Sequence, residues 1–209
     1  MKYATAVSRL QSVAEEANDH WLRFGDTEIG WPVDELWVAG ELLDGPEELD
    51  ALAMILMLDE PVDELPWLAL HASGEWVGER LRLTKLPIAW AYRPAVYPAW
   101  NARYQRVLRF WSAKAGPDRE VIEQLSQRRL DRLPIVTPAP EELAVQLEVE
   151  LEACRRYLGQ VLEDYWDDGW RRRHRGFGVD PEDHLWRAAM AVHEIGDALD
   201  GARRRQAGP

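Results

Sequence analysis

The chain has 209 residues and a formal net charge of −12, which suits one domain of ordinary size and opposes long-range attraction to nucleic acid. Its single cysteine, Cys154, excludes an internal disulfide and is typical of a reducing compartment. No segment approaches the ~20 apolar residues that span a bilayer, and the first residues lack the apolar run of a signal peptide, so we expect a cytoplasmic protein without a membrane partner.

The first predicted element is a helix that ends at Gly25. Its apolar residues recur at steps of three and four, which is the period of one helix face. This stripe consists of Tyr3, Val7, Leu10, Ala14, Ala17 and Trp21.

Strands are predicted over 36–39, over 52–58 and from Leu86 to Tyr92. The segment 52–58 is apolar throughout, which predicts a central strand that is covered on both faces. Acidic residues surround Pro61 in the segment 59–65, and this composition predicts the start of a helix there.

The segment from Trp100 to Ser112 fits two patterns. Trp100, Tyr104, Val107 and Trp111 would share a helix face, whereas the residues from Val107 to Trp111 have strand composition. We favour a strand after a turn, because three strands alone would leave poorly protected sheet edges.

The remainder of the chain is predicted to be helical. A short helix is expected within 118–130, and a proline-rich linker follows over 132–140. A long apolar stripe from Leu143 to Tyr165 and a capped helix that begins at Asp180-Pro181 predict an antiparallel helical hairpin. The residues 201–209 are expected to form a frayed basic tail.

These elements predict an α+β (α/β) fold with a small mixed sheet of about four strands, flanking helices and a C-terminal antiparallel hairpin. The sheet region is expected over 1–135 and the hairpin over 136–209, the two packed together as one structural domain.

Charge is distributed unevenly along the chain. Residues 1–70 carry 16 acidic and 3 basic side chains, whereas residues 71–135 carry 12 basic and 6 acidic ones. Opposite charges on two faces favour self-association or a protein partner over a nucleic-acid partner. The eleven tryptophans indicate an aromatic core, with a ligand-stacking platform as the alternative.

A helix, a strand that ends at Gly40, an acidic turn and an apolar strand follow in an order that resembles the nucleotidyltransferase superfamily. The resemblance implies that Gly40 and Glu41 contact a nucleotide and that carboxylates of the turn hold metal. Candidates for these carboxylates are Asp44, Glu48 and Asp50.

This chain departs from the family pattern at two positions. Glu41 stands where the family has a serine, and Leu52 stands where the second carboxylate of a spaced pair is expected. Metal-assisted phosphoryl transfer needs convergent carboxylates. The departures therefore predict a non-catalytic protein, a pseudoenzyme without metal or cofactor, for which a nucleotide remains a candidate ligand.

The chain as a whole also resembles an uncharacterised bacterial family known only as a domain of unknown function. The similar stretches are 31–40 and 181–187. This resemblance implies no activity.

The last helix holds Arg187 and His193, whose spacing is similar to the arginine-to-histidine motif of the HEPN ribonucleases. A histidine could move the 2′-hydroxyl proton while an arginine holds the phosphate. The two side chains would point about 240° apart on one helix, so a structural role is favoured.

The most concentrated positive charge is a cluster of arginines just before the last helix. It could bind phosphate, but the favoured alternative is pairing with the preceding acids, Glu163, Asp164, Asp167 and Asp168. The cluster consists of Arg171, Arg172, Arg173 and Arg175.

The favoured function is therefore that of a non-catalytic, nucleotidyltransferase-like binding or regulatory protein. The alternatives are a divergent nucleotidyltransferase or HEPN-like RNase, and a structural module that forms homo-oligomers.

Overall fold

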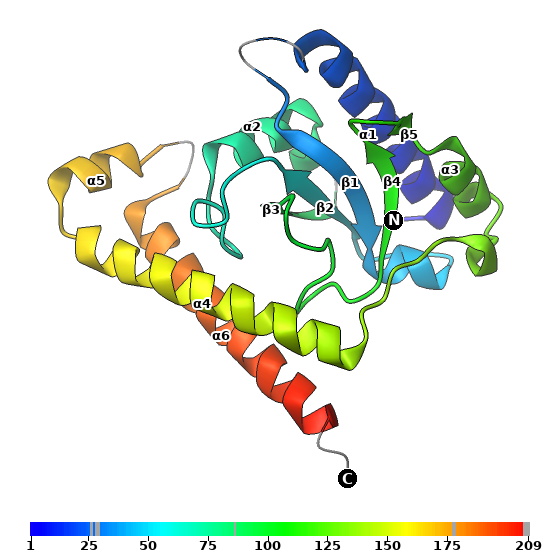
Figure 1. Ribbon diagram of the computed structural model, residues 1–209. Helices are drawn as coiled ribbons and strands as arrows, with labels where there is room; N and C mark the ends of the chain where they lie inside the picture. Colours follow the sequence, from blue (N-terminus) through cyan, green and yellow to red (C-terminus); the bar gives the residue numbers. More distant parts are fainter. Residues whose placement is uncertain (26, 28–29, 86, 177–178, 207–209) are drawn as a thin grey trace. The chain divides into compact units, whose positions relative to one another are not determined.

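A computed structural model describes residues 1–25, 27, 30–85, 87–176 and 179–206. The chain divides into two compact units. The sheet unit comprises Met1–Glu60 and Ala72–Thr137, and the helical unit comprises Pro61–His71 and Pro138–Pro209. Figure 1 shows the elements of both units. The predicted α+β class, with a mixed sheet, flanking helices and a helical C-terminal region, is confirmed.

The sheet unit contains five strands in the order β3-β2-β1-β4-β5. Strand β1 pairs antiparallel with β2 and β4, and β2 pairs parallel with β3, so the sheet is mixed. The short fifth strand adds one to the expected four. The strands are β1 (Val33–Ala39), β2 (Leu52–Leu58), β3 (Ile88–Pro94), β4 (Val107–Ser112) and β5 (Gly116–Pro117). Leu86, where the third strand was expected to begin, lies outside the described residues.

The predicted central strand is β2, and six of its seven residues are buried. On one face of the sheet, Ile55 and Met57 pack with Ala39, Val107 and Ala99. Because Ala99 belongs to the segment between β3 and β4, that segment covers this face of the sheet.

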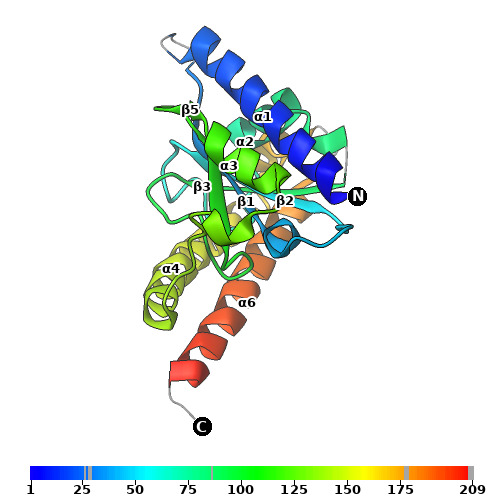
Figure 2. The same cartoon turned by 90° about the vertical axis from the view of Figure 1, so that its right-hand side faces the viewer.

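Helix α1 (Tyr3–Phe24) follows the predicted stripe. Tyr3, Val7 and Leu10 are buried, Trp21 is half-buried, and the helix closes with the Gly25 N–H donating to the Trp21 carbonyl. Helix α3 (Arg119–Ser126) confirms the predicted short helix and packs against α1 (Figure 2).

The segment from Trp100 to Ser112 resolves in favour of the strand. The side chain of buried Asn101 accepts hydrogen bonds from the N–H groups of Arg103 and Tyr104, both at 2.9 Å. This turn is incompatible with a single helix over 100–112, and β4 begins after it.

The helix predicted to start within 59–65 is wrong, because those residues form turns and the helix α2 begins at Ala72 (Ala72–Arg80). Pro66 disfavours a helical conformation at Leu65, and Leu68 has a positive φ of 61°. Helix α2 then packs closely on β3, with Gly78 beneath the ring of Trp90.

The helical unit consists of α4 (Pro140–Asp164), α5 (Asp168–Arg173) and α6 (Pro181–Gln206). Helices α4 and α6 run antiparallel (Figure 1), and Arg203 near the end of α6 binds Glu148 near the start of α4 at 2.7 Å. The short helix α5 was not predicted from the sequence.

The expected frayed tail is wrong for residues 201–206, which continue α6. Ala202 is fully buried and Arg203 is held by Glu148, so tertiary contacts stabilise this last turn. Residues 207–209 lie outside the described part of the chain.

Candidate functional site

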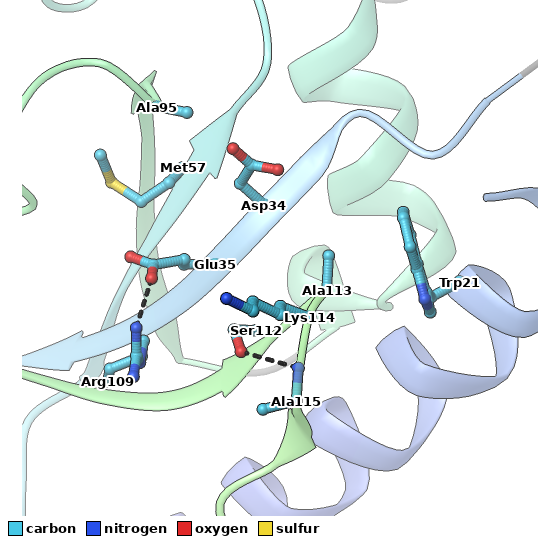
Figure 3. A pocket seen from close by; sticks show the side chains of 10 residues that line it. All are labelled: Trp21, Asp34, Glu35, Met57, Ala95, Arg109, Ser112, Ala113, Lys114 and Ala115. Atoms are coloured by element: carbon cyan, nitrogen blue, oxygen red, sulfur yellow. Dashed lines mark hydrogen bonds and ion pairs between the residues drawn. The ribbon is translucent and has the colours of Figure 1, made fainter.

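The sheet unit carries an open cleft of about 690 Å³ beside the start of β1 and the end of β4 (Figure 3). Such a volume suits a small organic ligand. Charged and apolar side chains both border it. Its lining residues are Trp21, Asp34, Glu35, Met57, Ala95, Arg109, Ser112, Ala113, Lys114 and Ala115.

Backbone pairing between β1 and β4 fixes the geometry of the cleft. Glu35 lies opposite Ser112, and the Ala113 N–H donates to the Asp34 carbonyl at 2.8 Å. The Ser112 hydroxyl accepts from the Ala115 N–H at 3.2 Å, which closes a turn that carries Lys114. The backbone therefore holds Asp34 and Lys114 on neighbouring segments.

Two of the charged residues in the cleft neutralise each other. The Arg109 guanidinium binds Glu35 Oε1 at 2.5 Å, and the Trp37 indole N–H donates to Glu35 Oε2 at 2.8 Å. Both carboxylate oxygens of Glu35 are thus occupied. This pair ties β4 to β1, and each of its two charges already has a partner within the protein.

Asp34, unlike Glu35, has no charged partner among the residues that the structure describes. Asp34 is exposed as a residue, but partial desolvation of its carboxyl group raises the pKa above the ordinary value, and the negative charges of Asp59 and Glu35 raise it further. Within the described residues, neither Asp34 nor the exposed Lys114 has a side-chain hydrogen bond or an ion pair. The cleft therefore presents one unpaired carboxylate and one unpaired ammonium group.

A smaller cavity of about 230 Å³ adjoins the cleft and shares Arg109, Ser112 and Ala115 with it. It adds Arg119 and the buried Trp111, whose indole N–H has no hydrogen-bond partner in the described structure. This cavity extends the polar surface along the turn between β4 and β5.

The residues expected from the nucleotidyltransferase resemblance lie at the other end of β1. Gly40 follows the strand with a φ of +70°, which favours glycine. Glu41 Oε2 accepts from the Asp50 N–H at 2.9 Å, and Asp44 forms an ion pair with Arg106. Among the described residues these acids form no convergent group: Glu41 closes the turn, and Asp44 ties it to the segment before β4. Glu48 contributes a backbone bridge to Lys2.

The position expected to supply a second carboxylate lies inside the sheet. Leu52 is fully buried, and its N–H donates to the Pro87 carbonyl. The side chain of Leu52 belongs to the core, so Asp50 has no carboxylate partner two positions along the chain.

The four arginines, for which the sequence favours pairing with the preceding acids over phosphate binding, lie on or just after α5, and two of them pair instead with acids that follow them. Arg171 binds Glu182 at 2.7 Å, Arg175 binds Asp180 at 3.3 Å, and the Arg172 Nε donates to the Asp168 carbonyl. The Asp167 carboxylate instead caps α5 by accepting from the Trp170 N–H. Arg173 is exposed on the last turn of α5.

The predicted pair Arg187 and His193 lies on one continuous helix, α6. His193 is exposed and lies 3.5 Å from Asp197, one turn further along. Arg187 is half-buried and close enough to His184 to lower the pKa of that imidazole. Each side chain has a local neighbour that accounts for its position.

Sequence reasoning missed the cleft residues Asp34, Glu35, Arg109 and Lys114. They belong to no spaced motif, and the available signal was the strand period that places Glu35 and Trp37 on one face. The sequence also predicts a strand at Arg109. It does not show that this strand, β4, lies beside β1, so the contact between Arg109 and Glu35 could not be predicted.

Within the described segments, no helix is long and apolar enough to cross a bilayer. A family model described as "Domain of unknown function (DUF7711)" matches residues 1–201. Searches of the curated proteins and of the solved structures found no match to this chain.

Proposed function

Since this chain belongs to the family described as domain of unknown function DUF7711, we propose that it is a non-catalytic binding protein whose ligand site is the cleft beside β1 and β4. The observation that carries the proposal is the cleft itself. It combines a volume of about 690 Å³ with an unpaired carboxylate at Asp34 and an unpaired ammonium group at Lys114. Ligand sites commonly combine an apolar lining with a few polar groups that fix orientation.

The nucleotidyltransferase-like scaffold is part of this proposal and is supported by the element order α1-β1-β2-α2-β3 and by Gly40 after β1. Lack of catalysis is supported by the carboxylates of the turn. Asp44 is neutralised by Arg106, and Glu41 accepts from the Asp50 backbone. Leu52 occupies the core position where phosphoryl transfer would require a further metal ligand.

A two-part experiment tests the proposal. A library of small metabolites, nucleotides included, is screened by thermal shift and by two-dimensional NMR on the full chain. Compounds that bind should shift resonances of the cleft residues. The variant Ala115→Trp should lose this binding, because the exposed Ala115 borders the cleft and an indole would fill it.

The matched control is Ala189→Trp, which adds the same indole to an exposed position of α6 in the helical unit. It should bind as the wild type does. Incubation with labelled nucleoside triphosphates and magnesium should transfer no label to nucleic acid or protein. Unchanged binding in Ala115→Trp would contradict the site, and label transfer that Asp50→Asn abolishes would contradict the non-catalytic assignment.

A second candidate function is self-association through the helical unit. Val145 and Val149 lie one turn apart on α4 with exposures of 64% and 49%, an apolar stripe that a second copy of the chain could cover. Sedimentation velocity should then give a dimer at micromolar concentration. The double variant Val145→Asp, Val149→Asp should be monomeric, and an unchanged sedimentation coefficient would exclude this stripe.

A further inference from the structure

The class of ligand can be inferred from the charges that border the cleft. Four ionisable side chains line it, and two of them, Glu35 and Arg109, form a closed pair at 2.5 Å. A ligand therefore meets mainly the two ionisable side chains that lie outside this pair. These two side chains are the carboxylate of Asp34 and the ammonium group of Lys114.

Main-chain contacts place residues 34 and 114 on neighbouring segments. The Asp34 carbonyl accepts from the Ala113 N–H, and Lys114 is the next residue in the turn. Figure 3 shows both side chains at the cleft, with the Glu35–Arg109 pair to one side and Trp21 to the other. The backbone hydrogen bond fixes the positions of the two residues, and the exposed side chain of Lys114 can adjust to a ligand.

The charges disfavour a purely anionic ligand. A phosphate or a nucleotide would gain Lys114 but would face Asp34, with Asp59 close enough to raise the pKa of Asp34 further. A purely cationic ligand would meet the reverse problem at Lys114. A ligand that carries one charge of each sign satisfies both groups and leaves neither charge opposed.

Apart from Ser112, the remaining lining residues are apolar and suit the carbon skeleton of such a ligand. Met57 and Ala95 lie on one side of the cleft, and Ala113, Ala115 and Trp21 line the rest of it. Burying this surface against carbon atoms adds a favourable contribution that a fully hydrated ion would not obtain.

We propose that the cleft binds a zwitterionic small molecule, whose amino group binds Asp34 and whose carboxylate binds Lys114. This inference rests on the proposed function, since it names the ligand class for the same site. The chemistry is that of an amino acid or a related amino carboxylate.

The test uses the full chain and probes whose charges are separated by different lengths: glycine, 4-aminobutyrate and 6-aminohexanoate. Each probe is paired with the alkylamine and the alkyl carboxylate that lack one charge, such as butylamine and butyrate. Binding is followed by NMR titration of the cleft residues. The best zwitterion should bind roughly tenfold more tightly than either singly charged partner, since each charged hydrogen bond contributes on that order.

Two variants assign the contacts. Asp34→Asn should remove the advantage of the zwitterion over the carboxylate, and Lys114→Met should remove its advantage over the amine. Asp131→Asn and Arg129→Met, at exposed positions outside the cleft, should leave both ratios unchanged.

The outcomes separate the two proposals. If other compounds, nucleotides for example, occupy the cleft more tightly than every zwitterion, the zwitterion assignment is overturned while the binding function stands. If no compound of any charge shifts the cleft resonances, both fail. Equal affinity for the zwitterion and for the simple carboxylate also overturns the assignment.

Discussion

Arg109 of β4 binds Glu35 of β1 across the sheet at 2.5 Å, while the Trp37 indole holds the second carboxylate oxygen of Glu35. Glu35 and Arg109 therefore contribute to the stability of the sheet, whereas the charges of Asp34 and Lys114 remain available in the cleft. Arg109 and Glu35 side chains are 49% and 30% exposed, so solvent weakens their attraction.

A double-mutant cycle with Glu35→Gln and Arg109→Met should therefore give a coupling free energy of about 0.5 to 1 kcal/mol in urea denaturation. The Arg203–Glu148 pair in the helical unit is more exposed and serves as the comparison, with an expected coupling nearer zero. A coupling of zero for Glu35 and Arg109 would contradict their assignment as a structural pair.

Replacement of Asp34 should stabilise the protein. The folded state raises the pKa of this exposed carboxyl group through partial desolvation and through Asp59 and Glu35, so the ionised form costs free energy at neutral pH. The variant Asp34→Asn should have a higher free energy of unfolding at pH 7. Its advantage should shrink as pH falls below the raised folded pKa and vanish below the pKa of the unfolded chain.

The stability of Asp34→Asn relative to the wild type also shows whether Asp34 is a binding residue or a structural one. Asp131→Asn, which changes an exposed aspartate elsewhere in the sheet unit, should leave the free energy of unfolding within error of the wild type. A loss of stability in Asp34→Asn at pH 7 would show that this carboxylate has a structural partner.

The helical unit should lose stability in mild acid. Burial, together with the positive charges of His174 and Arg187, lowers the pKa of His184 to about 4 against the opposing effect of Asp183. The unfolded state binds a proton near pH 6.5 and the folded state only near pH 4. The free energy of unfolding should therefore fall as pH decreases across this interval.

Chemical denaturation at several pH values measures this slope, and His184→Leu should reduce it. His193→Gln is the matched control, because His193 is exposed on the same helix. The pKa of His20 in the sheet unit is also lowered, so part of the slope should remain in His184→Leu. A slope identical to that of the wild type would contradict the assignment.

The close approach of α2 to β3 predicts a steric effect. A Cβ atom at Gly78 would lie 2.4 Å from the ring of Trp90, so Gly78→Ala should cost about 1 to 3 kcal/mol. Gly196→Ala in α6 meets nothing within 4 Å and should gain up to about 1 kcal/mol from helix propensity. Urea denaturation measures both, and equal effects of the two changes would show that α2 can shift away from Trp90.

Local sequence patterns were sufficient for the elements with long periodic stripes. The apolar stripe of α1 and the apolar run of β2 each predict from local sequence alone which residues are buried. The same reasoning failed at 59–65, where an acidic segment with a proline resembles a helix start but Pro66 and Leu68 redirect the chain. Helix α5 has six residues, too few for a periodic signal.

The candidate site could not be read from the sequence for a different reason. Asp34 and Lys114 are far apart in the chain, and they meet because β1 pairs with β4 as well as with its sequence neighbour β2. Residue spacing does not predict the pairing of β1 with β4, because that pairing depends on the order of all strands in the sheet. The same holds for Glu35 and Arg109.

The sequence by itself determined the class of fold, the buried strand over 52–58, the C-terminal helical hairpin and the leucine at position 52, where the nucleotidyltransferase resemblance leads one to expect a carboxylate. Tertiary structure alone decided which charges are paired. Charge pairing depends on distances of a few ångströms between distant segments, and only the strand order brings Arg109 to Glu35 and leaves Asp34 and Lys114 unpaired at one cleft.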